Sequence, residues 1–250
     1  MKVLFVCSGN NKSFDIAPFI RQQGESLRKQ EVEVDFFPIV GKGIPGYLKA
    51  AIRLRRHLKT CRYDLIHAHF TLSGWTAVLG GGRTPVVLSL MGDDAYGAYI
   101  GVNRILFSSR LLMLLTWLIQ PFVKAIISKS QNIENYVYLK RKSFIVPNGV
   151  DVKGFQQLAV MEPEHLLKEK KTILFLGNKS EIRKNYSLVQ SAVSLMNLPN
   201  VELINPYPVK HADVPRLLHS VDVLAVPSLM EGSPDRKSTR LNSSHRTGSR

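Results

Sequence analysis

Short stretches of continuous hydrophobic residues alternate with longer amphipathic stretches along the first part of the chain. Because several of the short stretches, such as Val3–Cys7, are apolar at consecutive positions, they indicate strands of a parallel sheet that helices cover on both faces. The predicted strands are residues 3–7, 32–37, 65–69, 86–90 and 125–128. Helices are predicted over residues 18–29 and 47–59, over a segment beginning near residue 73, and over a long apolar segment from about residue 104. The pattern therefore predicts an α/β domain.

The alternation pauses and then begins again in the second part of the chain. The pause contains Asn148-Gly-Val-Asp151 and the charged stretch 162–171. After it, strands are predicted at residues 172–176, 201–204 and 223–226, and helices at 186–196 and 214–219. We therefore expect a first Rossmann-like domain over residues 1–152, a hinge or linker over 153–171, and the first part of a second α/β domain over 172–234.

The last residues differ in character from everything before them. Asp235–His245 reads D-R-K-S-T-R-L-N-S-S-H, which matches one reading frame of a common short-read sequencing adapter. We therefore interpret residues 235–250 as an adapter-derived tail and exclude them from fold reasoning, with a disordered basic tail as the alternative. The native protein is then expected to continue differently after Pro234, and the chain as written is expected to be inactive.

The net charge of +15 favours anionic partners such as nucleotide phosphates or acidic lipid headgroups. A nucleic-acid binder would interleave basic residues with exposed aromatics, and no such stretch is found, so no nucleic-acid partner is expected. The two cysteines have no metal-binding or disulfide spacing. No secretory signal is recognised, and the apolar stretch 111–123 is shorter than the roughly 20 residues of a spanning helix, so it is read as a buried or interfacial helix. These features suit a cytoplasmic protein.

Polar residues follow several predicted strands of the first domain, where ligands bind in open α/β sheets. Gly9 and Asn10 lie in the loop after the first strand, where a glycine lets the backbone approach a phosphate; an ordinary turn is the alternative. His69 ends the third strand and is a candidate to bind a hydroxyl or to act as a general base, against a structural histidine. Asp94 follows the fourth strand and is a candidate for binding hydroxyl groups, against a helix cap.

The second domain repeats this arrangement. Gly177 and Asn178 follow its first strand, and Lys184 precedes its first helix, where a cation adds to the N-terminal dipole and suits a diphosphate. A solvated surface lysine is the alternative. Glu231 follows the third strand, and a carboxylate there can accept hydrogen bonds from ribose or sugar hydroxyls.

These residues resemble a known family, the bacterial retaining glycosyltransferases of family four, whose members have the two-domain GT-B fold. The resemblance covers residues 1–234. It is carried by Val146-Pro-Asn-Gly-Val-Asp151, Phe175-Leu-Gly-Asn178 followed by Lys184, His69-x-x-x-Ser-Gly74, Ser89-Leu-Met-Gly-Asp-Asp94 and Glu231-Gly-Ser-Pro234.

The resemblance implies transfer of a sugar from a UDP- or GDP-linked donor, with retention, without a cofactor and without a metal. It implies that Lys184 neutralises the donor diphosphate. Glu231, with Gly232 and Ser233, would contact the transferred sugar as the first carboxylate of an E-x7-E pair. The first-domain loop with Gly9 and Asn10 would lie near the phosphates.

The chain departs from the family pattern at three positions. Asn178 stands where many members have arginine, and Met91 stands where many have histidine. Thr239, in the adapter-like tail, holds the position of the second carboxylate. Without the arginine, Lys184 is expected to neutralise more of the diphosphate charge. Without the histidine, a neighbour such as Asp93 or Asp94 is expected to supply the missing polar contact.

The acceptor is less clear from the sequence. The helix at 47–59 has an apolar stripe and an opposite basic face. The stripe consists of Tyr47, Leu48, Ala51, Leu54 and Leu58, and the basic face of Lys49, Arg53, Arg56 and Lys59. A solvated face is one reading; the other is peripheral contact with an anionic membrane, which would fit a lipid-linked saccharide acceptor in envelope polysaccharide synthesis. A soluble saccharide acceptor, a sugar-nucleotide epimerase of the same fold and a catalytically inert fragment are the remaining alternatives. A nucleotide-dependent oxidoreductase is disfavoured because the glycine fingerprint is absent.

Overall fold

The computed structural model describes residues 1–250 except 11–14, 42, 102–103, 150–169, 211–212 and 230–250. The chain divides into two compact units. The first contains Met1–Ala98 and Ile105–Asn148, and the second contains Tyr99–Arg104 and the described residues after Asn148. The expected linker, residues 153–171, lies almost entirely outside the described residues.

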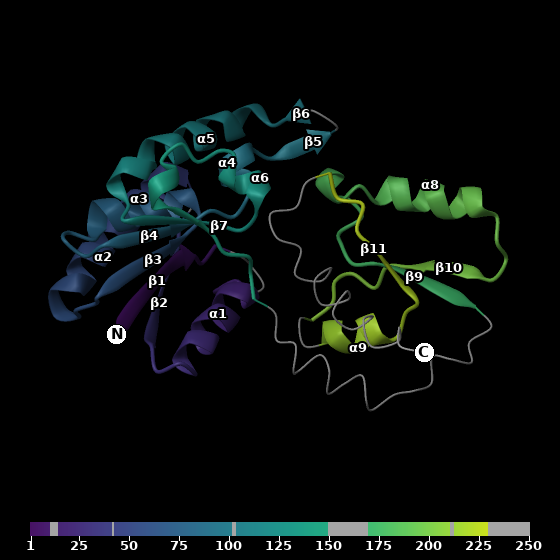
Figure 1. Cartoon of the computed structure of the whole chain (residues 1–250), viewed down its shortest axis with the longest axis horizontal. Helices are drawn as coiled ribbons and strands as arrows, with labels where there is room; N and C mark the ends of the chain where they lie inside the picture. Colours follow the sequence, from purple (N-terminus) through teal and green to yellow (C-terminus); the bar gives the residue numbers. More distant parts are fainter. Residues whose placement is uncertain (11–14, 42, 102–103, 150–169, 211–212, 230–250) are drawn as a thin grey trace. The chain divides into compact units, whose positions relative to one another are not determined.

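A parallel six-stranded sheet organises the first unit, with the strand order β2-β1-β3-β4-β7-β8 (Figure 1). The strands are β1 (Lys2–Ser8), β2 (Glu33–Ile39), β3 (Leu65–His69), β4 (Val86–Ser89), β7 (Ala125–Ser128) and β8 (Ser143–Ile145). The predicted parallel α/β sheet is confirmed. Continuous burial along the middle of β1 explains why its sequence is apolar without alternation.

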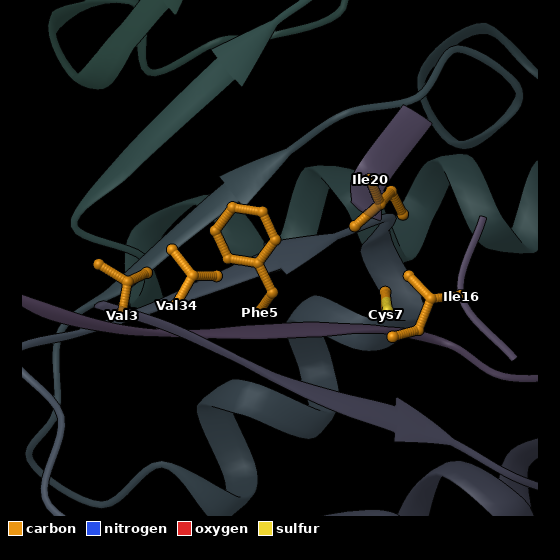
Figure 2. Packing of buried hydrophobic residues seen from close by; sticks show 6 residues of the cluster. All are labelled: Val3, Phe5, Cys7, Ile16, Ile20 and Val34. Atoms are coloured by element: carbon orange, nitrogen blue, oxygen red, sulfur yellow. The ribbon is translucent and has the colours of Figure 1, made fainter. Parts of the chain in front are cut away.

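Helices cover both faces of this sheet (Figure 1). They are α1 (Pro18–Arg28), α2 (Gly43–Thr60), α3 (Thr71–Gly80) and α5 (Phe107–Ile119). The helix α1 lies on one face, where Ile20 packs with Phe5, Cys7 and other residues of a buried cluster (Figure 2). The helices α2, α3 and α5 lie on the other face. The first unit therefore has three layers, a sheet between two layers of helices, as in Rossmann-like domains.

Several short elements lie between these strands and helices along the chain. They are α4 (Asp93–Tyr96), β5 (Tyr99–Gly101), β6 (Arg104–Ile105), η1 (Gln120–Phe122), α6 (Gln131–Glu134) and η2 (Lys140–Lys142). The sequence placed a helix from about Arg104, which is wrong at its start, since Arg104 and Ile105 form a strand paired with β5 and α5 begins at Phe107. Elements of two to four residues are too short to show a periodicity.

A second parallel sheet, with the order β10-β9-β11, organises the second unit. Its strands are β9 (Lys171–Phe175), β10 (Val201–Ile204) and β11 (Val223–Ala225). The helices α8 (Tyr186–Met196) and α9 (Val214–His219) lie on opposite faces of it (Figure 1), and the short helix η4 (Ile182–Lys184) precedes α8. Leu174 of β9 is fully buried against Val214 and Leu218 of α9. All three strands and both helices match their sequence predictions within one residue.

Within the described part of the chain, no helix is long and apolar enough to cross a membrane. The apolar stretch 111–123 is divided between α5 and η1, and Pro121 lies in η1.

Candidate functional site

The loop after β1 is held tightly against the end of β2. The backbone N–H of Gly9 donates to the carbonyl of Ile39 at 2.8 Å. A Cβ atom at position 9 would lie 2.8 Å from the Cβ of Pro38, so only glycine fits without displacement. The Asn10 amide donates to the carbonyl of Gly41 at 2.9 Å, and its oxygen accepts the Gly41 N–H at 2.8 Å. The side chain of Asn10 therefore joins two loops. Backbone groups of the loop, rather than this side chain, would make the predicted phosphate contact.

Tyr47 of α2 lies beside the same loop and forms a hydrogen bond with Ser8. Burial raises the pKa of the Tyr47 phenol above its usual value, and the Ser8 contact acts in the opposite direction. The phenol is therefore neutral at physiological pH and can donate or accept a hydrogen bond. The sequence analysis treated Tyr47 only as part of an apolar stripe, because aromatic residues at helical spacing more often pack than bind.

His69 is placed inside the first unit rather than on its surface. Its side chain is 1% exposed and stacks on the His67 ring with the ring centroids 4.3 Å apart. Among the described residues, neither ring nitrogen of His69 has a hydrogen-bond partner, whereas His67 Nε2 lies 2.8 Å from the Ser89 hydroxyl oxygen. Burial, and then the positive charge of Lys129, lowers the pKa of His67 to about 3. The pKa of His69 is also far below its usual value, chiefly because of burial, so both rings are neutral at pH 7.

Lys129 follows β7 and lies near both histidines. It is 4% exposed, and burial lowers its pKa to about 8. Buried lysines are rare, and the cost of desolvating the charged ammonium is the reason for the lower pKa. The sequence analysis did not single out Lys129, because a lysine directly after a strand has no pattern that distinguishes it from a solvated one.

Asp94 is fully buried and holds two loops together. Its carboxylate accepts the backbone N–H groups of Met91 and Gly92 at 2.9 and 3.0 Å, and that of Thr71, at the start of α3, at 3.0 Å. The Thr71 hydroxyl lies 3.2 Å from the same carboxylate. Burial raises the pKa of Asp94, while these N–H donors act to lower it. The structure thus places Asp94 among the residues that fix the turn between β4 and α4.

Gly92 caps α4 with a backbone φ of 120°, a conformation that residues with a Cβ rarely adopt. Met91, one of the three departures from the family pattern, has a half-buried side chain. Its backbone, rather than its side chain, is what Asp94 binds.

Glu134 is a second buried carboxylate in the first unit, at 8% exposure. It accepts hydrogen bonds from the Ser128 hydroxyl at 2.7 Å and the Ser143 hydroxyl at 2.5 Å, and its other oxygen lies 3.5 Å from the Lys140 ammonium. These contacts join the ends of β7 and β8. Glu134 was not recognised from the sequence, since its partners come from three separate segments.

In the second unit, the structure brings Gly177 and Lys184 together. A Cβ atom at position 177 would lie 3.5 Å from the Cγ of Lys184, so the lysine side chain passes close to the turn after β9. Asn205, at the end of β10, donates to the carbonyls of Phe175 and Gly177 at 2.8 and 2.9 Å. Asn178 binds within its own turn, where its side-chain oxygen accepts the Ser180 N–H at 3.0 Å.

The segment after β11 is attached to the residues around Lys184. The Asn185 side chain donates to the carbonyl of Pro227 at 3.3 Å, and the Leu229 N–H donates to the carbonyl of Arg183 at 2.9 Å. Leu229 precedes Glu231 by two residues in the sequence. Gly177, Lys184 and the segment that leads to Glu231 thus lie close together at the carboxyl edge of the β9–β11 sheet.

Glu231, Gly232 and Ser233 lie outside the described residues, so their predicted contacts with a donor stay predictions. The same holds for Thr239 and the rest of the tail. Across the described ranges, no group of three or more His, Cys, Asp and Glu side chains could hold a metal ion.

Asn205 is the functional candidate of the second unit that sequence reasoning missed. It follows a strand directly, as Asn178 does, and that position at the carboxyl end of β10 was the available signal.

Comparison with known proteins agrees with the parallel α/β architecture. The chain is similar in structure to the lipopolysaccharide outer core galactosyltransferase WaaB, with a TM-score of 0.60 and 13% identity over 97% of this chain and 78% of that one. It is similar to the Anabaena protein HepE, solved with UDP and glucose, with a TM-score of 0.59 and 14% identity over 96% and 78% of the two chains. For the UDP-GlcNAc 2-epimerase of Methanocaldococcus jannaschii the TM-score is 0.53, with 10% identity over 90% and 78%.

At these identities the likeness shows a fold shared with GT-B glycosyltransferases and no more. No curated protein sequence matches the chain. The sequence profile of Glycosyltransferase Family 4, however, matches residues 2–153, which is more than half of the chain and includes the loop after β1, His69 and Asp94. The chain therefore belongs to Glycosyltransferase Family 4.

Proposed function

We propose that this protein transfers a sugar from a UDP- or GDP-linked donor to a saccharide or lipid-linked acceptor of the cell envelope, with retention and without a cofactor. The observation that carries the proposal is the edge of the β9–β11 sheet, where Lys184 lies against Gly177 and beside the segment leading to Glu231. Family membership supports glycosyl transfer as the reaction class. UDP as a donor nucleotide is supported by the similar protein that was solved with UDP and glucose.

The chemistry of that edge suits a leaving diphosphate. When the bond to the sugar breaks, negative charge develops on the departing nucleotide diphosphate, and a fixed cation stabilises this charge more than the ground state. Lys184 supplies the cation, and Asn205 holds the Gly177 turn in place through two carbonyls. We propose that the Glu231 carboxylate accepts hydrogen bonds from hydroxyl groups of the transferred sugar and that Gly232 and Ser233 lie beside the same sugar. We further propose that Asn178 lies beside the donor.

For the first unit, we propose that His69 and Asp94 position loops rather than touch the substrate. Both are buried, and Asp94 already accepts hydrogen bonds from three backbone N–H groups. The loop with Gly9 and Asn10 is the part of this unit that we propose to approach the donor phosphates. The segments after β3 and β4, which Asp94 joins through the backbone N–H groups of Thr71, Met91 and Gly92, would then form the acceptor side.

We also propose that the native sequence differs from residue 235 onward and supplies a second glutamate where Thr239 stands. Resequencing the locus tests this proposal directly. Finding Asp235–His245 encoded without interruption would contradict it, and a glutamate codon at position 239 of the native frame would support it.

A sugar-nucleotide epimerase is the second candidate, because epimerases such as that of M. jannaschii share the fold. The two activities differ in their products. The protein encoded by the uninterrupted gene is incubated with UDP- and GDP-sugars, with and without saccharide and lipid-linked acceptors, and the products are separated. We expect a new glycoside that forms only with an acceptor. An epimerised sugar nucleotide that forms without any acceptor would instead establish the epimerase.

A further inference from the structure

The helix α5 has its large apolar side chains on the outside. Phe107, Leu111, Leu114 and Leu118 are spaced by three or four residues and therefore lie along one side of the helix, and their exposed fractions are 79%, 55%, 51% and 40%. Phe122, in η1 just after the helix, extends the line and is 64% exposed. We call these five residues the α5 stripe. A stripe of this kind on a soluble surface marks an interaction site, because single exposed apolar residues are common and contiguous ones are not.

The opposite side of α5 carries polar residues, and these are buried. Thr116 is 2% exposed and its hydroxyl lies 2.7 Å from that of Thr71 and 2.6 Å from the carbonyl of Asp94. Ser109 is 6% exposed and donates to the carbonyl of Leu106 at 2.6 Å. The inner side also includes the fully buried Ile119, so what distinguishes α5 from an ordinary surface helix is that large apolar residues line its outer side as well. Its outer side is suited to an apolar medium.

The surroundings of the α5 stripe are basic and aromatic. Between Asp94 and Glu134 the sequence contains no acidic residue, while Arg104, Arg110 and Lys124 are exposed. The Arg110 guanidinium lies 5.5 Å from the centre of the Phe107 ring. Trp117, 51% exposed, lies at the flank of the stripe, and its ring centroid is 4.8 Å from that of Tyr138, which is 41% exposed. Tryptophan and tyrosine are typical of the boundary between lipid headgroups and acyl chains.

The helix α2 adds further positive charge on the same side of the sheet (Figure 1). Its exposed residues include Lys49, Arg53, Arg55, Arg56 and Lys59, together with the apolar Ile44, Leu48 and Ile52. Of the apolar stripe identified in the sequence, Leu48 is 50% exposed, whereas Ala51 and Leu54 are buried. The helical layer α2–α3–α5 therefore presents basic and apolar groups and, within α2 and α5, no acidic residue.

We propose that the α5 stripe inserts into the headgroup region of an anionic lipid bilayer and that the basic residues of α2 and α5 attract the first unit to it. This deepens the proposed function, since it rests on a lipid-linked acceptor being reached at a membrane surface. Charge decides between a bilayer and a second copy of this chain as the occupant. Two copies of the stripe facing each other would bring Arg110 and Lys124 against the same residues of the other copy, whereas an acidic bilayer complements them.

Binding of the full chain to vesicles tests the proposal. A Trp75→Phe variant leaves Trp117 as the only tryptophan, because the chain has two. On adding vesicles of phosphatidylcholine and phosphatidylglycerol, we expect its fluorescence to shift to shorter wavelength and to be quenched by lipids brominated in the acyl chains. An unchanged spectrum, or sedimentation with vesicles without quenching, would contradict insertion of the stripe.

A matched pair of variants separates insertion from general stickiness. Leu111, Leu114 and Leu118 are replaced by Gln in one variant, and the exposed Leu188, Leu195 and Met196 of α8 are replaced by Gln in the other. Because burial of apolar area drives interfacial binding, we expect the α5 variant to partition to vesicles at least about tenfold less and the α8 variant to change less than about twofold. Equal partitioning of the α5 variant and the unmodified chain would overturn the proposal.

The electrostatic part has its own test. Reversing Arg53, Arg56 and Lys59 to Glu should abolish sedimentation with anionic vesicles and leave the weak binding to pure phosphatidylcholine unchanged, and salt should weaken binding of the unmodified chain. A chain that ignores vesicles but forms dimers that the α5 variant abolishes would show that the occupant is a second copy. Calorimetric titration with UDP- or GDP-sugar should be unaffected by the α5 variant, so failure of this inference is distinct from failure of the proposed transfer.

Discussion

Single residues near the carboxyl edge of a sheet determine what each unit can bind. Lys184 illustrates this, because a lysine before a helix is usually solvated, yet here its side chain passes the Gly177 turn. A phosphate at this edge would meet the ammonium and the turn together.

We predict that, in the protein encoded by the uninterrupted gene, Lys184→Ala weakens binding of a UDP- or GDP-sugar by more than tenfold. The loss of a charge-assisted contact to phosphate costs roughly 1.5–3 kcal/mol, which corresponds to this change in affinity. Calorimetric titration measures it. Lys170→Ala is the matched control, since Lys170 is exposed and precedes β9 at the opposite edge of the sheet. Equal affinities for the two variants would show that Lys184 is a solvated surface lysine that does not contact the donor.

The buried histidines predict an acid-sensitive first unit. Because the pKa of His67 is about 3 in the fold and 6.5 in the unfolded chain, the unfolded state binds a proton below pH 6.5 that the folded state does not. Stability is therefore complete above pH 6.5 and decreases as the pH falls, by ~1.4 kcal/mol per pH unit for each such histidine. With His69 acting in the same direction, we expect a loss of ~4 kcal/mol between pH 7.5 and 5.

Urea titrations followed by tryptophan fluorescence measure this loss, because both tryptophans, Trp75 and Trp117, lie in the first unit. His69→Asn should remove about half of the pH dependence. His219→Asn, in the second unit, should leave it unchanged. A free energy of unfolding that is flat from pH 7.5 to 5 would show that the histidines are accessible to protons in the folded state.

At the scale of elements, strands buried on both faces were readable from the sequence. The strands β3 and β7 have the predicted limits, Leu65–His69 and Ala125–Ser128. A charged residue, Asp64 or Lys124, directly precedes each strand and marks where it begins. The helix α5 shows where this reasoning stops. Its apolar side was expected to be buried or interfacial, and only the structure shows that Thr116 faces inward and Leu111 outward.

The inward polar side of α5 gives a stability prediction. Thr116→Val keeps the shape of the side chain and removes the hydroxyl that lies within hydrogen-bond distance of Thr71 and of the carbonyl of Asp94. The Thr71 hydroxyl keeps its contact with the Asp94 carboxylate, but the buried carbonyl of Asp94 loses this donor. The loss should lower the free energy of unfolding by about 1–3 kcal/mol. The urea midpoint of the first unit measures the change. Ser108→Ala, on the exposed side of the same helix, should change it by less than about 0.5 kcal/mol.

At the scale of the whole molecule, the order of motifs indicated the fold class, and the family profile agrees with it. Gly9, Gly177 and Lys184 were found because they follow or precede predicted elements at a sheet edge. Lys129, Glu134 and Asn205 were missed because their meaning comes from partners distant in the sequence, such as the Gly177 carbonyl that Asn205 binds. His69 and Asp94 were located, but their burial could not be read from strand ends alone.

We propose that a nucleotide-sugar binds at the carboxyl edge of the β9–β11 sheet. Hydrogen–deuterium exchange of the full chain, with and without UDP- and GDP-hexoses, tests it most directly because it requires no turnover. We expect added protection in peptides covering residues 176–186 and in those following β11. Protection that is unchanged there, or that appears only at the amino ends of the strands around Lys171 and Asp222, would contradict the account.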